Sequence, residues 1–143
     1  MRCGSFKYCL LILTALLGCR DKPAVNTAAI RHYIIQLGLS DRIITGGVGF
    51  TGKDNPTADA YKSLLQIAPD SVWVRLSYSP KPVIRMYAFE ALHSKNSPEL
   101  EEVTSRLKTD TAVVCEVSGD LEITTSIAQY VSMARRRKDK GKD

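Results

Sequence analysis

Cys115 and His93 are the residues of this chain whose types are best suited to nucleophilic chemistry, as a thiol and a base. Cys115 has apolar neighbours in the sequence, namely Ala112, Val113, Val114 and Val117. Reactive cysteines need surroundings that favour the thiolate, and apolar neighbours do not supply them. We therefore expect an inert, buried thiol. A small envelope hydrolase or thiol enzyme that uses Cys115 and His93 is the alternative hypothesis.

Two other patterns could bind a cofactor or a metal ion. Residues 47–53 match the G-x-x-x-x-G-K pattern of a phosphate loop, but Asp54 stands where a serine or threonine would hold magnesium. A carboxylate at that position would face the phosphates, and Pro56 delays the helix whose amides should bind them. The two histidines, His32 and His93, are not spaced as zinc ligands. We expect a plain glycine-rich loop, with no metal and no bound cofactor.

Aromatic and arginine residues gather around the proline-rich connection at 79–82. We name them the aromatic–arginine patch: Trp73, Arg75, Tyr78, Arg85 and Tyr87. Tyr, Trp and Arg are enriched at protein interfaces, so this patch is the candidate partner-binding surface. Burial in the core of a helical hairpin is the alternative, because aromatic side chains carry much of core packing. Arg85 is expected to form an ion pair with Asp110 or Asp70.

The N-terminal segment has the features of a lipoprotein signal peptide. Residues 1–7 are basic, residues 8–17 form an apolar run about half as long as the ~20 residues of a membrane-spanning helix, and Gly18 precedes Cys19. The end of this run resembles the lipobox of bacterial lipoproteins. The resemblance implies cleavage before Cys19 and a covalent lipid with palmitate-type chains on that residue, which would anchor the protein in the cell envelope. Arg20 slightly favours the outer membrane.

The charge of the chain is concentrated at its two ends. The net charge of +5 divides into two bases and no acid in residues 1–18, six bases and two acids in residues 135–143, and 12 bases and 13 acids between them. The neutral body argues against nucleic-acid binding. The tail is expected to be a solvated, disordered end. Its candidate contacts with anionic lipid headgroups are Arg135, Arg136, Arg137 and Lys138.

Helical periodicity runs through the rest of the chain and predicts an all-α fold of short antiparallel helical hairpins. Residues 44–56, with four glycines and a proline, are expected to form a loop. Pro82 fits the first turn of a helix. The expected helices span residues 28–39, 71–77, 83–94, 111–117 and 121–134, with two more that open at Asn55 and at Ser97.

Residues 82–92 (PVIRMYAFEAL) resemble the second helix of a HEAT-type repeat, and residues 107–114 resemble the start of the next unit. A faint repeat with a period near 30 residues relates 75–85 to 106–115, although Cys115 stands where an arginine is expected. Residues 44–114 also resemble an uncharacterised group of bacterial proteins with a Gly-Phe-x-Gly loop, a helix and a Pro-Val-x-Arg-x-Tyr-Ala-Phe segment. The resemblance implies an α-solenoid fragment and no particular activity.

The expected organisation is a cleaved signal peptide at 1–18, a tether at 19–27, a HEAT-like helical domain at 28–134 and a basic tail at 135–143. The whole mature chain has room for one domain. We expect a membrane-anchored lipoprotein whose helical domain is a non-enzymatic protein-interaction or scaffold module for another envelope protein. Apart from the lipid on Cys19, no cofactor is expected, and no nucleic acid.

Overall fold

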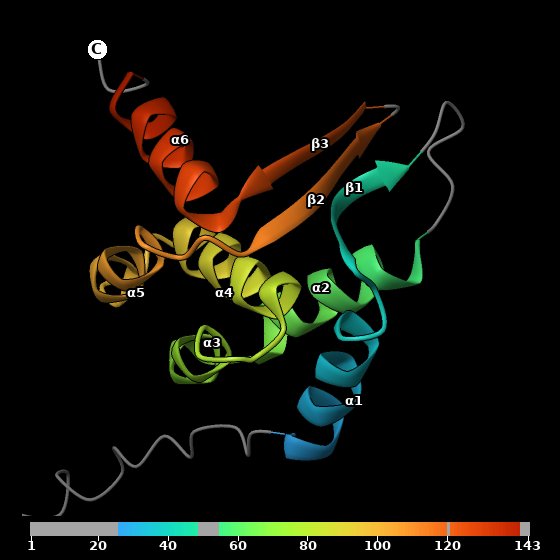
Figure 1. The fold of residues 1–143 in the computed structure, drawn as a ribbon. Coiled ribbons are helices and arrows are strands. Elements are labelled where there is room, and N and C mark those ends of the chain that lie inside the picture. The colour runs from blue at the N-terminus through green and yellow to red at the C-terminus, as the bar shows by residue number, and fades with distance from the viewer. Residues whose placement is uncertain (1–25, 49–54, 120, 141–143) are drawn as a thin grey trace, which may run out of the picture.

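The computed structural model describes residues 26–48, 55–119 and 121–140, which form a mixed α and β fold (Figure 1). The helices are α1 (Thr27–Leu37), α2 (Pro56–Ile67), α3 (Asp70–Leu76), α4 (Pro82–Ser94), α5 (Leu100–Leu107) and α6 (Ile127–Lys140). The strands are β1 (Arg42–Val48), β2 (Val113–Gly119) and β3 (Leu121–Ser126). The expectation of an all-α, HEAT-like fold is therefore wrong.

The helix starts follow the capping signals of the sequence. Asn55 caps α2, because its side-chain oxygen accepts hydrogen bonds from the amides of Thr57 and Ala58 at 2.9 and 3.3 Å. Asn26 caps α1 in the same way, with a bond from Ala29 of 3.0 Å. α4 begins at Pro82, whose missing N–H would have no partner in a first turn. Five of the expected helices are present, and these local signals mark the starts of three of them, α1, α2 and α4.

The three strands form one mixed sheet with β2 in the centre. β1 pairs with β2 in parallel, and Arg42 lies opposite Cys115. β3 pairs with β2 antiparallel, from Ser126 opposite Val113 to Leu121 opposite Ser118. Parallel neighbours need a long crossover connection, and here α2 to α5 provide it.

β2 and β3 replace helices that the periodicity predicts at 111–117 and 121–134. Both strands are rich in β-branched residues, whose stiff side chains favour a pleated strand. The second unit expected at 107–114 is thus loop and strand rather than helix, so the repeat with 75–85 is not structural. Helical spacing holds only from Ile127 onward, where Ile127 and Val131 are fully buried. α6 continues to Lys140 and includes the first part of the basic tail.

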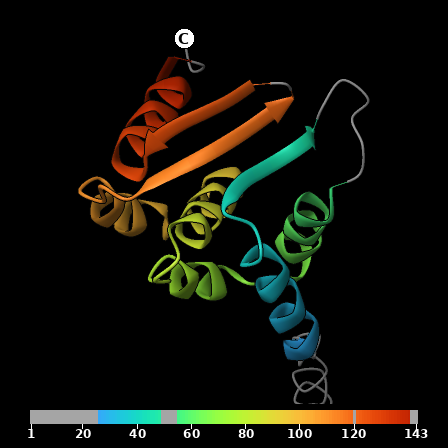
Figure 2. The same cartoon turned by 45° about the vertical axis from the view of Figure 1, so that its right-hand side comes forward.

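α4 is the central helix of the molecule. In Figures 1 and 2 it lies between the sheet and α3, with α5 beside it. Eight of its side chains are buried: Val83, Ile84, Met86, Tyr87, Ala88, Phe89, Ala91 and Leu92. One face of the sheet joins this core through Ile43 and Val114. Burial all around α4 explains why its sequence is apolar on more than one face.

The opposite face of the sheet is covered only near β1. Ile44 and Val117 form a small cluster there with Ala58 of α2. The hairpin of β2 and β3 extends past the helices toward its tip, and α6 diverges from it in both views (Figures 1 and 2). Within the described part of the chain, no helix combines the length and the apolar character needed to cross a membrane.

Candidate functional site

The structure separates the members of the aromatic–arginine patch. Trp73 and Tyr87 are fully buried, whereas Arg75 and Tyr78 are exposed. Tyr61 of α2 packs against both buried rings, with ring centroids 6.1 Å from Trp73 and 5.1 Å from Tyr87. The two largest members therefore belong to the core, and a partner cannot reach them.

Tyr87 joins α4 to β1 through its hydroxyl. The oxygen accepts a hydrogen bond from the amide of Ile44 at 2.8 Å, and the hydroxyl lies 3.3 Å from the Ile44 carbonyl, to which it donates. Burial raises the pKa of Tyr87 to about 12, against a smaller lowering by the bond with Ile44. Tyr87 is a structural residue that ties the first strand to the central helix.

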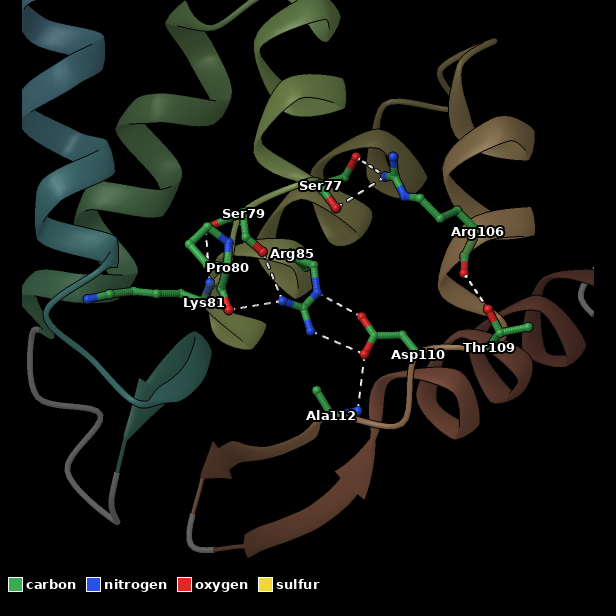
Figure 3. A network of polar contacts seen from close by, with 9 residues as sticks. All are labelled: Ser77, Ser79, Pro80, Lys81, Arg85, Arg106, Thr109, Asp110 and Ala112. Atoms are coloured by element: carbon green, nitrogen blue, oxygen red, sulfur yellow. Dashed lines mark hydrogen bonds and ion pairs between the residues drawn. The ribbon is translucent and has the colours of Figure 1, made fainter.

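Arg85 forms the ion pair with Asp110 that the sequence predicts (Figure 3). Its Nε and Nη2 donate to the two carboxylate oxygens at 2.7 and 3.1 Å, and its Nη1 donates to the carbonyls of Ser79 and Pro80 at 2.8 and 3.2 Å. The amide of Ala112 also donates to Asp110, at 3.0 Å. This network joins the α3–α4 corner to the segment that leads into β2.

The charge state of Asp110 follows from these bonds. Burial raises the pKa of Asp110, but the hydrogen bonds from Arg85 and from the Ala112 amide lower it by more, so the pKa lies below its ordinary value. Both side chains are about 85% buried, with exposed fractions of 16% for Arg85 and 15% for Asp110. The pair is therefore shielded from solvent and has a structural role.

Tyr78 and Arg75 are the exposed members of the patch, and Tyr78 contacts Arg106 of α5. The guanidinium carbon of Arg106 lies 3.4 Å from the centre of the Tyr78 ring, a cation–π contact. Arg106 also donates to the carbonyl of Ser77 at 3.2 Å and to its hydroxyl. No spacing rule links residues on separate helices, so the sequence analysis did not include Arg106.

Cys115 is partly exposed rather than buried as expected, and it lies beside the carboxylate of Glu122. Its thiol donates to Glu122 of β3 at 3.0 Å, and this hydrogen bond, with burial and the charge of Glu122, raises the pKa of the thiol. His93 stacks on Phe89, with ring centroids 5.6 Å apart, and its buried Nε2 has no hydrogen-bond partner among the residues that the structure describes. The geometry disfavours the thiolate that a nucleophile requires.

The β2–β3 hairpin carries three exposed apolar side chains. Val113, Leu121 and Ile123 have exposed fractions of 63%, 67% and 49%. The register places Ile123 on the face of the sheet that also carries the core residue Ile43, but nearer the tip. Among the strands that the structure describes, β3 pairs with β2 alone, so within this part of the chain its other side is an open edge, which we call the β3 edge. An open edge presents unpaired backbone N–H and C=O groups to a neighbour.

A hollow of about 400 Å³ lies where β2 begins. Its walls are residues 38–41, residues 81–83 and the first two residues of β2. Lys81 crosses it and donates to the carbonyl of Gly38 at 2.6 Å. Leu39 is 74% exposed at its rim. The hollow is thus an open depression whose one cation is already bonded to the backbone.

Several expected features lie outside the described residues. They include the signal peptide, Cys19 and residues 49–54 of the expected glycine-rich loop, and the side chains of Arg135 to Lys138 are likewise not described. The expectation of a loop over 44–56 is wrong for residues 44–48, which belong to strand β1. Among the described residues, no group of three His, Cys, Asp or Glu side chains could hold a metal ion. No protein-family model matches this chain, and neither a curated protein nor a solved structure matches it.

Proposed function

We propose that the protein is a lipid-anchored component of the cell envelope whose folded part binds another protein through the β2–β3 hairpin. The observation that carries this proposal is the uncovered β3 edge, with Leu121 and Ile123 exposed beside it. Strand addition to an open edge is a common mode of recognition, in which backbone hydrogen bonds give affinity and alternate side chains give specificity.

The anchor is supported by the sequence pattern that ends at Cys19. α1 begins at Thr27, so seven residues separate it from the proposed lipid site. Seven extended residues span at most about 25 Å. The short connection would keep the folded part near the membrane surface, with the hairpin at the end of the molecule away from the start of α1 (Figure 1). Its partner would then be another envelope protein.

The hairpin is a better candidate surface than the polar network around Arg85. Arg85 and Asp110 use their charged groups on each other and on nearby backbone, which leaves little for a partner. The exposed apolar side chains of the hairpin have no such internal role. Burying them on association would remove apolar surface from water, which favours binding.

Photo-crosslinking in native membranes tests the proposal. A photoreactive amino acid at Ile123 in the full-length protein should give a crosslink to a protein. The same group at Gln66, an exposed residue of α2, should give none. Identical products at both positions, or no protein product at Ile123, would rule out the hairpin as the binding surface.

The anchor needs a separate experiment. Cys19→Ser should abolish labelling of the protein by a fatty-acid probe, while Cys115→Ser should leave labelling intact. Unchanged labelling of the Cys19→Ser variant would refute the anchor without bearing on the hairpin.

A further inference from the structure

The two edges of the sheet differ in how they are protected. β1 shifts its register between Ile44 and Val48, and Ile44 packs on Ala58 of α2. An irregular register of this kind keeps a strand edge from pairing with another chain, whereas the α2 contact covers only a face of the sheet. β3 instead pairs with β2 in one uninterrupted register, and all its residues from Leu121 to Thr124 are exposed. β3 is the unprotected edge.

β3 also lacks the side chains that usually guard an edge. It contains no lysine, arginine or proline. Its one charged residue, Glu122, accepts a hydrogen bond from Arg42 of β1 at 3.2 Å, so its charge is balanced within the chain. Glu122 lies on the face of the sheet opposite to Leu121 and Ile123. Neither charge nor proline therefore opposes the approach of another strand.

We propose that the occupant of the β3 edge is a second copy of this chain, paired antiparallel about a two-fold axis at Ile123. The proposal rests on the proposed function, since it names the partner of the same surface. Residues opposite each other in an antiparallel pair share a face. This register places Ile123 against Ile123 of the second copy, Leu121 against Thr125 and Glu122 against Thr124.

The register follows from the chemistry of the strand. With Ile123 on the axis, the apolar side chains of both copies continue along one face of the joined sheet. Each Glu122 carboxylate meets a threonine hydroxyl, which can donate to it. A register centred on Glu122 would instead place two carboxylates opposite each other, which is unfavourable.

A second copy accounts for the edges better than an unrelated strand does. Two-fold pairing closes both β3 edges at once and joins the sheets in the order β1-β2-β3-β3-β2-β1. The outer edges of this six-stranded sheet are the two β1 strands, in which the register shift interrupts regular pairing. An isolated partner strand would instead become a new open edge of the sheet. Isologous two-fold dimers are also the commonest oligomers.

Disulfide trapping in native membranes tests the pairing. Opposite Cα atoms of an antiparallel pair are about 4.5–5.5 Å apart, within the ~7 Å limit for a disulfide. The full-length Ile123→Cys protein should form a reducible dimer on mild oxidation. The Ile35→Cys protein, altered at an exposed apolar residue of α1, should remain monomeric on the gel, as should the unaltered chain with Cys115.

The mass of the full-length protein in mild detergent provides the second readout. We expect a dimer whose dissociation constant rises at least about tenfold in Ile123→Lys and is unchanged in Ile35→Lys. Circular dichroism establishes that each variant is folded, and the cysteine trap remains informative if the lysine variant unfolds.

Three results would overturn the inference in different ways. If the dissociation constant of the dimer is unchanged in Ile123→Lys and Ile123→Cys forms no disulfide, the dimer uses another surface. A monomer whose Ile123 still photo-crosslinks to a different protein would refute the second copy and leave the proposed function standing. A chain with no protein contact at Ile123 would refute both.

Discussion

At the scale of single residues, one guanidinium holds together segments that are far apart in the chain. The Arg85 side chain extends from α4 and donates hydrogen bonds to the Asp110 carboxylate and to the carbonyls of Ser79 and Pro80. Asp110 in turn fixes the start of β2 through Ala112, and its carbonyl accepts from the Ala128 amide of α6. Because the pair is largely buried, removing one partner would leave the other desolvated and unpaired.

Asp110→Asn should lower the free energy of unfolding by about 2 kcal/mol at pH 7, because it leaves the buried Arg85 charge without its counter-ion. Urea unfolding measures the change. The control is Asp59→Asn, which removes an exposed carboxylate 3.9 Å from Lys62 and should cost less than about 0.5 kcal/mol. Equal losses in the two variants would contradict a structural role for the Arg85–Asp110 pair.

The same carboxylate gives a pH dependence. The pKa of Asp110 in the folded protein lies below its ordinary value, so its stabilising effect is present above pH ~4 and is lost as the pH falls through the folded value. The difference in stability between the unaltered chain and Asp110→Asn should therefore shrink in acid. Urea midpoints at pH 7 and at about pH 3 would show it, and a constant difference would contradict it.

The Cys115 thiol gives another prediction at this scale. Glu122 raises the thiol pKa, so Glu122→Gln should lower it and increase the rate of alkylation several-fold near neutral pH. A fluorescent maleimide measures the rate, with Cys115→Ser as the blank. If the unaltered chain already reacts faster than a free thiol peptide, the raised pKa is incorrect and the thiol-enzyme alternative gains support.

At the scale of elements, β1 is attached to the molecule by a few specific contacts. It pairs with β2 on one side only, and the Tyr87 hydroxyl holds the Ile44 amide and carbonyl from α4. Without that hydroxyl, the buried Ile44 amide would lose its partner. The position of β1 therefore depends on a side chain that the sequence assigns to a surface patch.

Tyr87→Phe should cost about 1–3 kcal/mol, because it leaves a buried amide unsatisfied while the ring keeps its packing. Tyr78→Phe removes an exposed hydroxyl that lies 3.4 Å from Glu102 and should change stability by less than about 0.5 kcal/mol. Thermal or urea unfolding compares the two. Amide hydrogen exchange should show the largest loss of protection in β1, and uniform losses would contradict this attachment.

Alkaline pH should loosen the same contact. The pKa of Tyr87 is about 12 in the folded protein and 10.0 ordinarily, so its neutral form is favoured by folding. Its contribution to stability is complete below about pH 10 and declines as the pH rises toward 12. The unfolding midpoint should fall over this range, and less steeply in Tyr87→Phe. If the unfolding midpoint of Tyr87→Phe falls with pH as steeply as that of the unaltered chain, the loss of stability at alkaline pH comes from other groups.

The sequence predicts the helices well and the strands poorly, for a physical reason. Asn55, Asn26 and Pro82 mark helix starts through local hydrogen bonding, which the chain carries within a few residues. β2 begins with the apolar run Val113-Val114-Cys115, and a short apolar run of that kind fits a buried helix equally well. Only the pairing of β2 with the distant strand β1 distinguishes a strand from a helix at this position.

The same limit applies to the candidate site. Arg85 and Asp110 are predictable as an ion pair, because an arginine on a buried helix needs an acid. Burial of Trp73 and Tyr87 is not predictable from composition, which cannot separate a core aromatic from an interface one. The helical periodicity predicts one helix over residues 121–134, and for that reason the sequence does not predict the β3 edge. The alternation of Leu121 and Ile123 at period two was the available signal.

At the scale of the whole molecule, the sheet is unevenly covered. Near β1 it is packed on both faces, by Ile43 against the core and by Ile44 against α2. Near the tip of the hairpin neither face is covered, and β3 is exposed. The proposed anchor would hold the folded part at the membrane, where association is confined to a surface.

Lipid anchoring and self-association should therefore reinforce each other. If Cys19→Ser releases the protein from the membrane, the Ile123→Cys disulfide should form less readily in the released chain at the same copy number, because the local concentration falls. Quantitative gels of membrane and released fractions measure this. Equal disulfide yield in the two fractions would mean that anchoring contributes nothing to pairing.

The parallel pairing of β1 with β2 has a consequence for how the chain acquires its structure. Arg42 of β1 pairs with Cys115 of β2 across an intervening stretch of about seventy residues. The strands β2 and β3, in contrast, are adjacent in the sequence and pair with each other. Contacts that span so much chain form late, because the ends of a long loop must first meet. The hairpin and α4 should assemble first, and the N-terminal strand should dock last.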